Sequence, residues 1–196
     1  MTQNTYYLDS STVATYFDFE LEYGSLSMAG ELIVFIGSRR ADSIYLMAGM
    51  SLDFTAAGGG ADSVYLKGRL ADYAISTTAE SITFSRGSGI TQEIVKMSAA
   101  TGSSADTVIF KDGAALASSI ANAFNTAQTP ILNSAKTSDS PSIPATGTTH
   151  VTAYADSGAT TFSSFKGATL VVVGSRGIDK VYVKEGSSVD ATALGG

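Results

Sequence analysis

The 196-residue sequence predicts a mostly β protein, either a β-sandwich or a short β-solenoid, with one α-helix docked against it. Three observations support this prediction. A unit made of a small or Gly-rich turn, one Asp and a strand of β-branched and aromatic residues recurs along the chain. Several other segments have strand periodicity, and only one has the apolar spacing of a helix. The 20 Gly residues and the low charged fraction of 15% suit a chain with many tight turns.

The repeated unit is the feature on which the other predictions depend. The four copies span Gly37–Leu46, Gly58–Leu66, Gly102–Phe110 and Gly174–Val183, and their aspartates are Asp42, Asp62, Asp106 and Asp179. A unit this short cannot bury its apolar face alone, so copies of it stack against one another. We therefore expect the units to be duplicated building blocks that lie side by side.

Two segments near the N-terminus are predicted strands. Within residues 12–23, Phe17, Phe19, Leu21 and Tyr23 alternate with Asp18, Glu20 and Glu22. This period-two pattern predicts a half-buried strand whose acidic face is either solvated or turned toward a cation or a partner. The short apolar run at 32–36 predicts a strand that is buried on both faces.

The middle of the chain predicts a hairpin, a further strand and the helix. Ala74–Ser76 and Ser81–Ser85 flank a four-residue turn, and the strand Glu93–Met97 follows. Residues 114–127 are the predicted helix, with a core-facing stripe that consists of Leu116, Ile120, Ala123 and Phe124.

Composition divides the chain into three parts. Residues 1–132 form a β-rich main domain with the helix, and residues 133–149, rich in Ser, Thr and Pro, form a linker or long loop. Residues 150–196 form a C-terminal β tail. We expect this tail to pack on the sheet of the main domain or on that of a neighbouring molecule.

Charge and residue counts narrow the function. The net charge of −6 disfavours nucleic acid as a partner, and divalent cations are the natural counterions. No window approaches about 18 consecutive apolar residues, so no membrane insertion by a helix is expected. The chain has no Cys, and its single His150 is not accompanied by a nucleophile motif. The sequence therefore predicts a protein that is not an enzyme, although convergence of two acids into a glycosidase pair is left open.

The segment 58–113 resembles secreted adhesins of the repeats-in-toxin type. The matching residues are the turn Gly58–Asp62, Leu70-Ala71-Asp72-Tyr73, and the run from Ala105 to Gly113. The resemblance implies export by a type I secretion system, to the outside or the cell surface of a Gram-negative bacterium. Such export fits residues 1–5, which lack a Sec-type signal. The resemblance also implies folding that depends on calcium.

Calcium binds six to eight oxygens from carboxylates, carbonyls and water, and turns rich in glycine expose such carbonyls. The candidate ligands are the four repeat aspartates together with two acids from the matched segment: Asp42, Asp62, Asp106, Asp179, Asp72 and Asp112. The alternative is that each Asp only accepts backbone amides in its own turn.

Repeated short strands without catalytic motifs predict a secreted structural protein. We expect it to assemble with itself into a fibre, surface layer or biofilm matrix by β-strand addition, with calcium. A monomeric calcium-binding adhesin or ligand-binding module is the first alternative, and a secreted carbohydrate-active enzyme is the second. Cell-surface glycans are a further expected partner, and they would stack on Tyr or Phe because the chain has no Trp.

Overall fold

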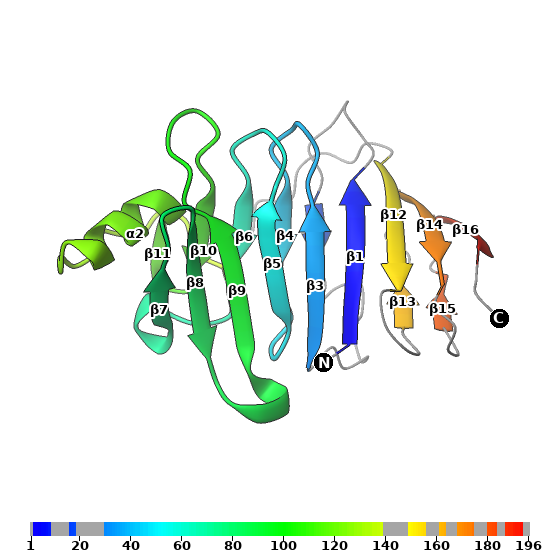
Figure 1. The fold of residues 1–196 in the computed structure, drawn as a ribbon, viewed down its shortest axis with the longest axis horizontal. Helices are drawn as coiled ribbons and strands as arrows, with labels where there is room; N and C mark the ends of the chain where they lie inside the picture. Colours follow the sequence, from blue (N-terminus) through cyan, green and yellow to red (C-terminus); the bar gives the residue numbers. More distant parts are fainter. Residues whose placement is uncertain are drawn as a thin grey trace.

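The fold is mostly β, as predicted (Figure 1). The computed structural model describes residues 2–8, 16–18, 30–138, 149–155, 161–163, 168–174, 180–183 and 187–193. The large sheet has nine strands in the order β16 (Ser188–Ala193), β14 (Ala168–Val173), β12 (Thr149–Ala155), β1 (Thr2–Leu8), β3 (Glu31–Ile36), β5 (Ser51–Ala56), β9 (Glu93–Ser98), β8 (Ser81–Arg86) and β7 (Ala74–Thr77).

A second layer lies against the large sheet. It contains the five-stranded sheet of β11 (Gly113–Leu116), β10 (Thr107–Phe110), β6 (Ser63–Tyr65), β4 (Ser43–Tyr45) and β2 (Tyr16–Asp18). The short strands β13 (Thr161–Ser163) and β15 (Lys180–Tyr182) pair with each other. The described part of the chain also holds helix α2 (Ala117–Asn125) and two 3-10 turns, Leu70–Asp72 and Gly89–Thr91.

From β3 to β6 the chain alternates between the two sheets, which is the path of a β-solenoid. Strands β3, β5 and β9 pair in parallel in the large sheet, and β4, β6 and β10 pair in parallel in the small one. Asp42 and Asp62 are 20 residues apart, whereas Asp62 and Asp106 are 44 apart. The 24 extra residues fall where the third coil carries the β7–β8 hairpin, and this insertion keeps the coils in register.

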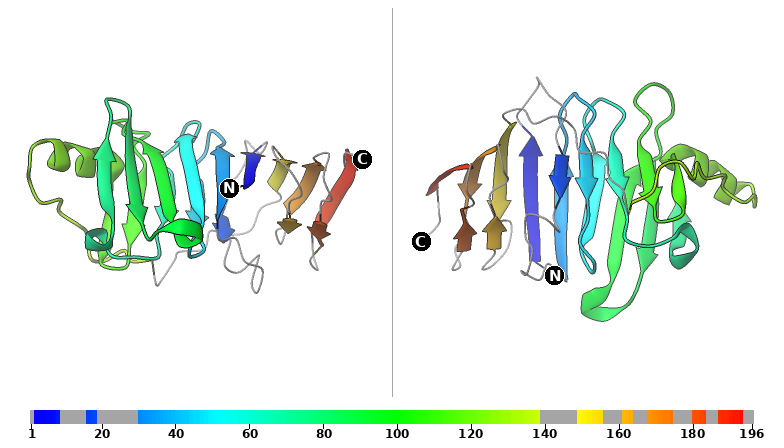
Figure 2. Two further views of the ribbon diagram at one scale, coloured as in Figure 1. Left: turned by 60° about the horizontal axis from the view of Figure 1, so that its bottom comes forward. Right: turned by 180° about the vertical axis from the view of Figure 1, so that it is seen from behind.

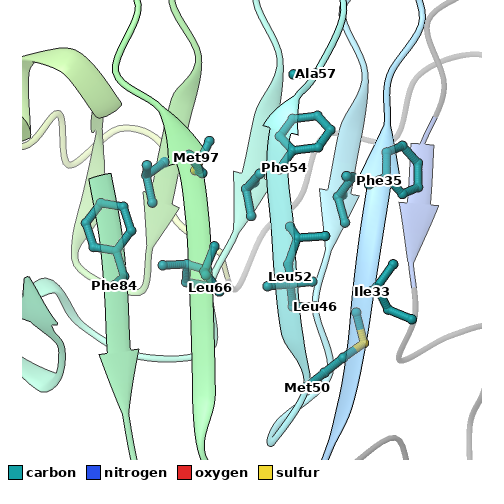
Figure 3. Packing of buried hydrophobic residues seen from close by; sticks show 14 of the residues in the cluster. Ile33, Phe35, Leu46, Met50, Leu52, Phe54, Ala57, Leu66, Phe84 and Met97 are labelled. Atoms are coloured by element: carbon teal, nitrogen blue, oxygen red, sulfur yellow. The ribbon is translucent and has the colours of Figure 1, made fainter. Parts of the chain in front are cut away.

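The core fills the space between the two sheets (Figure 3). Alternate residues of the large sheet point into it, so Ile33, Phe35 and Phe54 are fully buried. The prediction that 32–36 is buried on both faces is wrong for the other residues of that strand, which are only half-buried. Among the described strands and helices, none lies over the outer face of β3, so this strand needs burial on one face only.

The predicted hairpin is confirmed, because β7 and β8 pair antiparallel. The helix is confirmed but shorter than predicted, since residues 114–116 belong to β11 and pair with β10. Of the predicted stripe, Ile120 and Ala123 are buried, whereas Leu116 is 41% and Phe124 is 49% exposed. Strand pairing takes the first turn of the predicted helix, so Leu116 belongs to β11 and not to the helical stripe.

Strands from residues 150–196 lie in the same large sheet as the first coils (Figure 2). β12 pairs antiparallel with β1, so two stacks of coils meet at this joint and run in opposite directions. At the joint the buried Tyr6 lies opposite Ala153, and the Tyr7 and Tyr154 rings meet edge to face at 5.2 Å.

Several predicted segments lie only partly within the described residues. Of the fourth repeat copy, residues 174 and 180–183 are described. Of the strand predicted at 12–23, residues 16–18 form β2 and the rest lie outside. Of residues 133–149, the first six are tied to the small sheet: Asn133 bridges Ala114, Ser138 donates its N–H to the Phe110 carbonyl at 3.0 Å, and Tyr45 donates its hydroxyl to the Ser138 carbonyl at 2.7 Å.

Candidate functional site

Three of the predicted aspartates form a buried row along one edge of the solenoid. Asp42, Asp62 and Asp106 each come directly before a strand of the small sheet, and the register of β4, β6 and β10 places them at equivalent positions. Their exposed fractions are 0%, 1% and 4%. Buried carboxylates are rare unless a partner compensates them, so the partners of this row decide what it does.

Backbone amides of neighbouring coils supply most of these partners. Asp62 Oδ1 accepts the Asp42 N–H at 2.6 Å, and Asp106 Oδ1 accepts the Asp62 N–H at 3.3 Å. Asp42 accepts the Ser38 N–H at 2.9 Å within its own turn. Asp62 and Asp106 therefore each link their own coil to the preceding coil, in addition to the backbone hydrogen bonds between the paired strands.

Close packing of the turns explains the glycines that precede the aspartates. Gly58 has φ +87°, and a Cβ there would overlap the Ser38 carbonyl of the preceding coil. Gly60 has φ +128° and lies directly against the Arg40 carbonyl. Only glycine allows both this backbone conformation and this approach. The turns thus bring their main chains into contact and leave the aspartates between them.

One carboxylate oxygen of the row lacks a partner. Asp62 Oδ2 is buried and has no hydrogen bond within the described structure. Burial raises the pKa of Asp62 to about 8, and the negative charges of Asp42 and Asp106 add to this effect. Burial also raises the pKa of Asp106 to about 6. In the absence of a cation, the row therefore favours holding a proton on Asp62 at neutral pH.

A pocket of about 370 Å³ adjoins the row, lined among others by Gly58, Gly60, Asp62, Ser104 and Asp106. This volume accommodates an ion together with several waters. Nowhere in the described residues do three or more His, Cys, Asp or Glu side chains surround one point. A cation here would need Asp62 and Asp106 as its charged ligands, with turn carbonyls and water as the rest. Calcium prefers such an all-oxygen set, whereas zinc prefers Cys and His.

The other predicted ligands lie elsewhere. Asp72 accepts the Arg69 N–H at 2.7 Å and Asp112 accepts the Leu70 N–H at 3.0 Å, so together they fasten one exposed 3-10 turn. Asp112 follows β10 whereas Asp106 precedes it, so these two acids lie at opposite ends of that strand. Asp179 lies outside the described residues.

Sequence reasoning missed a second polar cluster, around Glu93. Its carboxylate accepts the Arg86 Nε and Nη2 at 2.5 and 2.8 Å, the Gly49 N–H at 2.9 Å and the Tyr73 hydroxyl at 3.3 Å. Burial and the Glu93 charge raise the pKa of Tyr73, and the hydrogen bonds to Glu93 raise that of Arg86. Four donors occupy this carboxylate, so it ties the hairpin to the coils. In the sequence, the opposite charges of Arg86 and Glu93 on either side of Gly87–Gly89 could have indicated this ion pair.

The fold and the site together define a two-sheet β-solenoid with a buried aspartate row. Comparison with protein-family models, with curated proteins and with solved structures finds no match to this chain. In the described residues, no helix has the length and apolar character that a membrane crossing requires.

Proposed function

We propose that the protein is a structural subunit that assembles with copies of itself into an extracellular fibre, surface layer or biofilm matrix. In this proposal it is exported from a Gram-negative cell, has no catalytic role, and binds calcium at the aspartate row. Cell-surface glycans are a further proposed partner.

The observation that carries the proposal is the difference between the two ends of the solenoid. At one end, α2 contacts β7, β8, β9 and β11 and buries Ile120 between the sheets. At the other end, no described helix or hairpin covers β16, and Val181 and Val189 are only partly buried against the core. Solenoids need polar terminal caps to stay discrete. An end that exposes core residues instead favours the addition of another subunit.

The edges of the large sheet support the same proposal. In the described structure, β16 pairs only with β14 and β7 pairs only with β8. Proteins that avoid association protect such edges with charges, proline or bulges. β7 contains no charge and no proline, whereas β16 carries one charge, Asp190, and its pairing with β14 has a register shift between Val171 and Val173. Both outermost strands still present one backbone edge to a further strand in the described structure, and β7 is the less protected of the two.

A monomeric calcium-binding module is the second candidate, and the unpartnered Asp62 Oδ2 favours it. A bound cation would satisfy this oxygen and would offset the repulsion between Asp62 and Asp106. Asp62 and Asp106 would then hold the ion next to Gly58 and Gly60, and the ion would stabilise the stacked turns.

Light scattering after size exclusion, with negative-stain microscopy, separates the two candidates. The assembly proposal expects particles whose mass grows with protein concentration in millimolar calcium and falls in chelator. Discrete monomers at every concentration with calcium would contradict it. Calcium-induced stabilisation of such monomers would instead support the second candidate.

A matched pair of variants localises the effect. Val189→Asp places a charge at the open end and should abolish growth, whereas Thr83→Asp places the same charge on the outer face of β8, opposite Lys96. Far-UV circular dichroism of both variants checks that the fold is retained. Equal growth of the two variants would exclude the β16 end as the assembling surface.

A further inference from the structure

We propose that subunits join head to tail: β16 of one copy pairs antiparallel with β7 of the next, and α2 of that next copy covers the inner face of β16. This inference rests on the proposed self-assembly and specifies its partner surfaces. The occupant of each edge is a second copy of this chain.

The directions of the edge strands permit this joint by translation alone. β7 is antiparallel to β8, and β8 is antiparallel to β9, so β7 runs in the same direction as β9, β5, β3 and β1. β12 is antiparallel to β1, and β14 and β16 are parallel to β12. The two edges thus run in opposite directions. A copy shifted along the sheet therefore places β16 antiparallel to β7 with the same face inward.

The chain already contains a joint of this kind. β1 and β12 belong to different coil stacks, and they pair antiparallel over five residue pairs with Tyr6 opposite Ala153 in the core. A β16–β7 joint would repeat this arrangement between molecules. It would continue the nine-stranded sheet from one subunit into the next, and repeated heterologous contacts of this kind form an open filament when the rotation does not close a ring.

Apolar residues are exposed at both ends of the molecule. In all three ribbon views α2 extends beyond β7, at the end of the molecule opposite β16 (Figures 1 and 2). Leu116 and Phe124 at this end are 41% and 49% exposed. At the other end, Val183 is 63% exposed and Val189 is partly buried. The projecting helix would supply a layer under β16, where no described strand or helix of the same subunit lies.

A two-fold joint of β16 with β16 of another copy is the rival arrangement. It also pairs strands antiparallel, but it would leave both inner faces of β16 without a covering helix. It would leave Leu116 and Phe124 exposed as well. The apolar surface of both ends is buried only in the head-to-tail joint, and burial of such surface drives association.

Introduced cysteines distinguish the two joints, because the chain has no native Cys. Ser188 and Asp190 are exposed on β16, and Ala74 and Ser76 are exposed on β7. Each of the four is replaced by Cys in a separate protein. Each β16 variant is then mixed with each β7 variant in millimolar calcium under mild oxidation. Disulfides form only when two Cβ atoms approach to about 3.5–4.5 Å, so the four mixtures sample the same-face registers.

We expect a disulfide-linked dimer in at least one mixture and none in any single-variant sample. Thr83→Cys, on an interior strand, serves as the control for random collision. Cross-linking of Ser188→Cys or Asp190→Cys with itself would overturn the head-to-tail joint in favour of the two-fold one. Assembled particles without cross-links in any mixture would overturn the joint and leave the proposed function standing. No particles at any concentration would overturn both.

Discussion

Replacing Asp62 by Asn tests the buried aspartate row quantitatively. The pKa of Asp62 is about 8 in the folded protein and 3.8 for the unperturbed group. Between these pH values the folded state binds a proton that the unfolded state does not, so stability falls as pH rises. At 1.36 kcal/mol per pKa unit, the contribution of Asp62 to the free energy of unfolding should fall by about 5 kcal/mol from pH 4 to pH 8.

The Asp62→Asn variant lacks this titration and keeps an acceptor for the Asp42 N–H. In chelator it should match the wild type near pH 4 and exceed it by several kcal/mol, on the order of 3–5, near pH 8. Asp106, with its pKa of about 6, leaves a smaller loss of stability between pH 4 and pH 6 in both proteins. Urea unfolding followed by circular dichroism from pH 4 to pH 9 gives the free energies.

Calcium should reverse the order of the two proteins at pH 8. If calcium binds the row as proposed, the ion would stabilise the wild type by pairing with Asp62 and would stabilise the variant little. Asp53→Asn is the control, because Asp53 lies on the outer face of β5 and, within the described residues, accepts side-chain hydrogen bonds only from the N–H and the hydroxyl of Thr55. It should retain the pH dependence and the calcium response of the wild type. A wild-type stability that is flat or rising between pH 5 and pH 8 in chelator would refute the account of this row.

Three further substitutions test the packing. Gly58→Ala should destabilise the fold by about 2 kcal/mol or more beyond Gly102→Ala. Both positions have positive φ, but only a Cβ at Gly58 would overlap a carbonyl of the preceding coil. Equal losses of stability in the two variants would argue against stacked turns. Glu93→Gln should cost about 3–5 kcal/mol by leaving Arg86 without its charge partner, and a cost below about 1 kcal/mol in urea unfolding would mean that the pair is solvated. Phe54→Ala should cost about 3–5 kcal/mol, and a thermal midpoint within about 2 °C of the wild type would exclude its place in the core.

The repeated unit made the fold class predictable from the sequence alone. A turn, an Asp and a short strand that recur after 20 residues can bury their apolar side chains only by stacking, and Asp42 and Asp62 do occupy equivalent positions. Asp106 follows the same pattern although the β7–β8 hairpin separates it from Asp62 along the chain. The β7–β8 hairpin was also predictable from local sequence signals, because its strand pairing joins residues that are close in sequence.

Contacts between distant segments were not predictable in the same way. The N–H groups of Asp42 and Asp62 each donate to the carboxylate of the next aspartate. These hydrogen bonds depend on how closely the turns approach each other, and the local sequence pattern does not determine that distance. The start of the helix depended on whether Gly113–Leu116 would pair with β10, a choice between two structures of similar local propensity. The exposure of Phe124 followed from where the sheet ends beneath α2.

Hydrogen exchange of β16 tests the central claim, that the solenoid is open at this end and adds a further subunit there. The amides of 188–193 that point away from β14 should exchange rapidly in dilute protein with chelator and become protected in concentrated protein with calcium. The amides of β5, interior to the sheet, should be protected in both conditions. Unchanged, rapid exchange along β16 in samples whose mass has grown would contradict the claim.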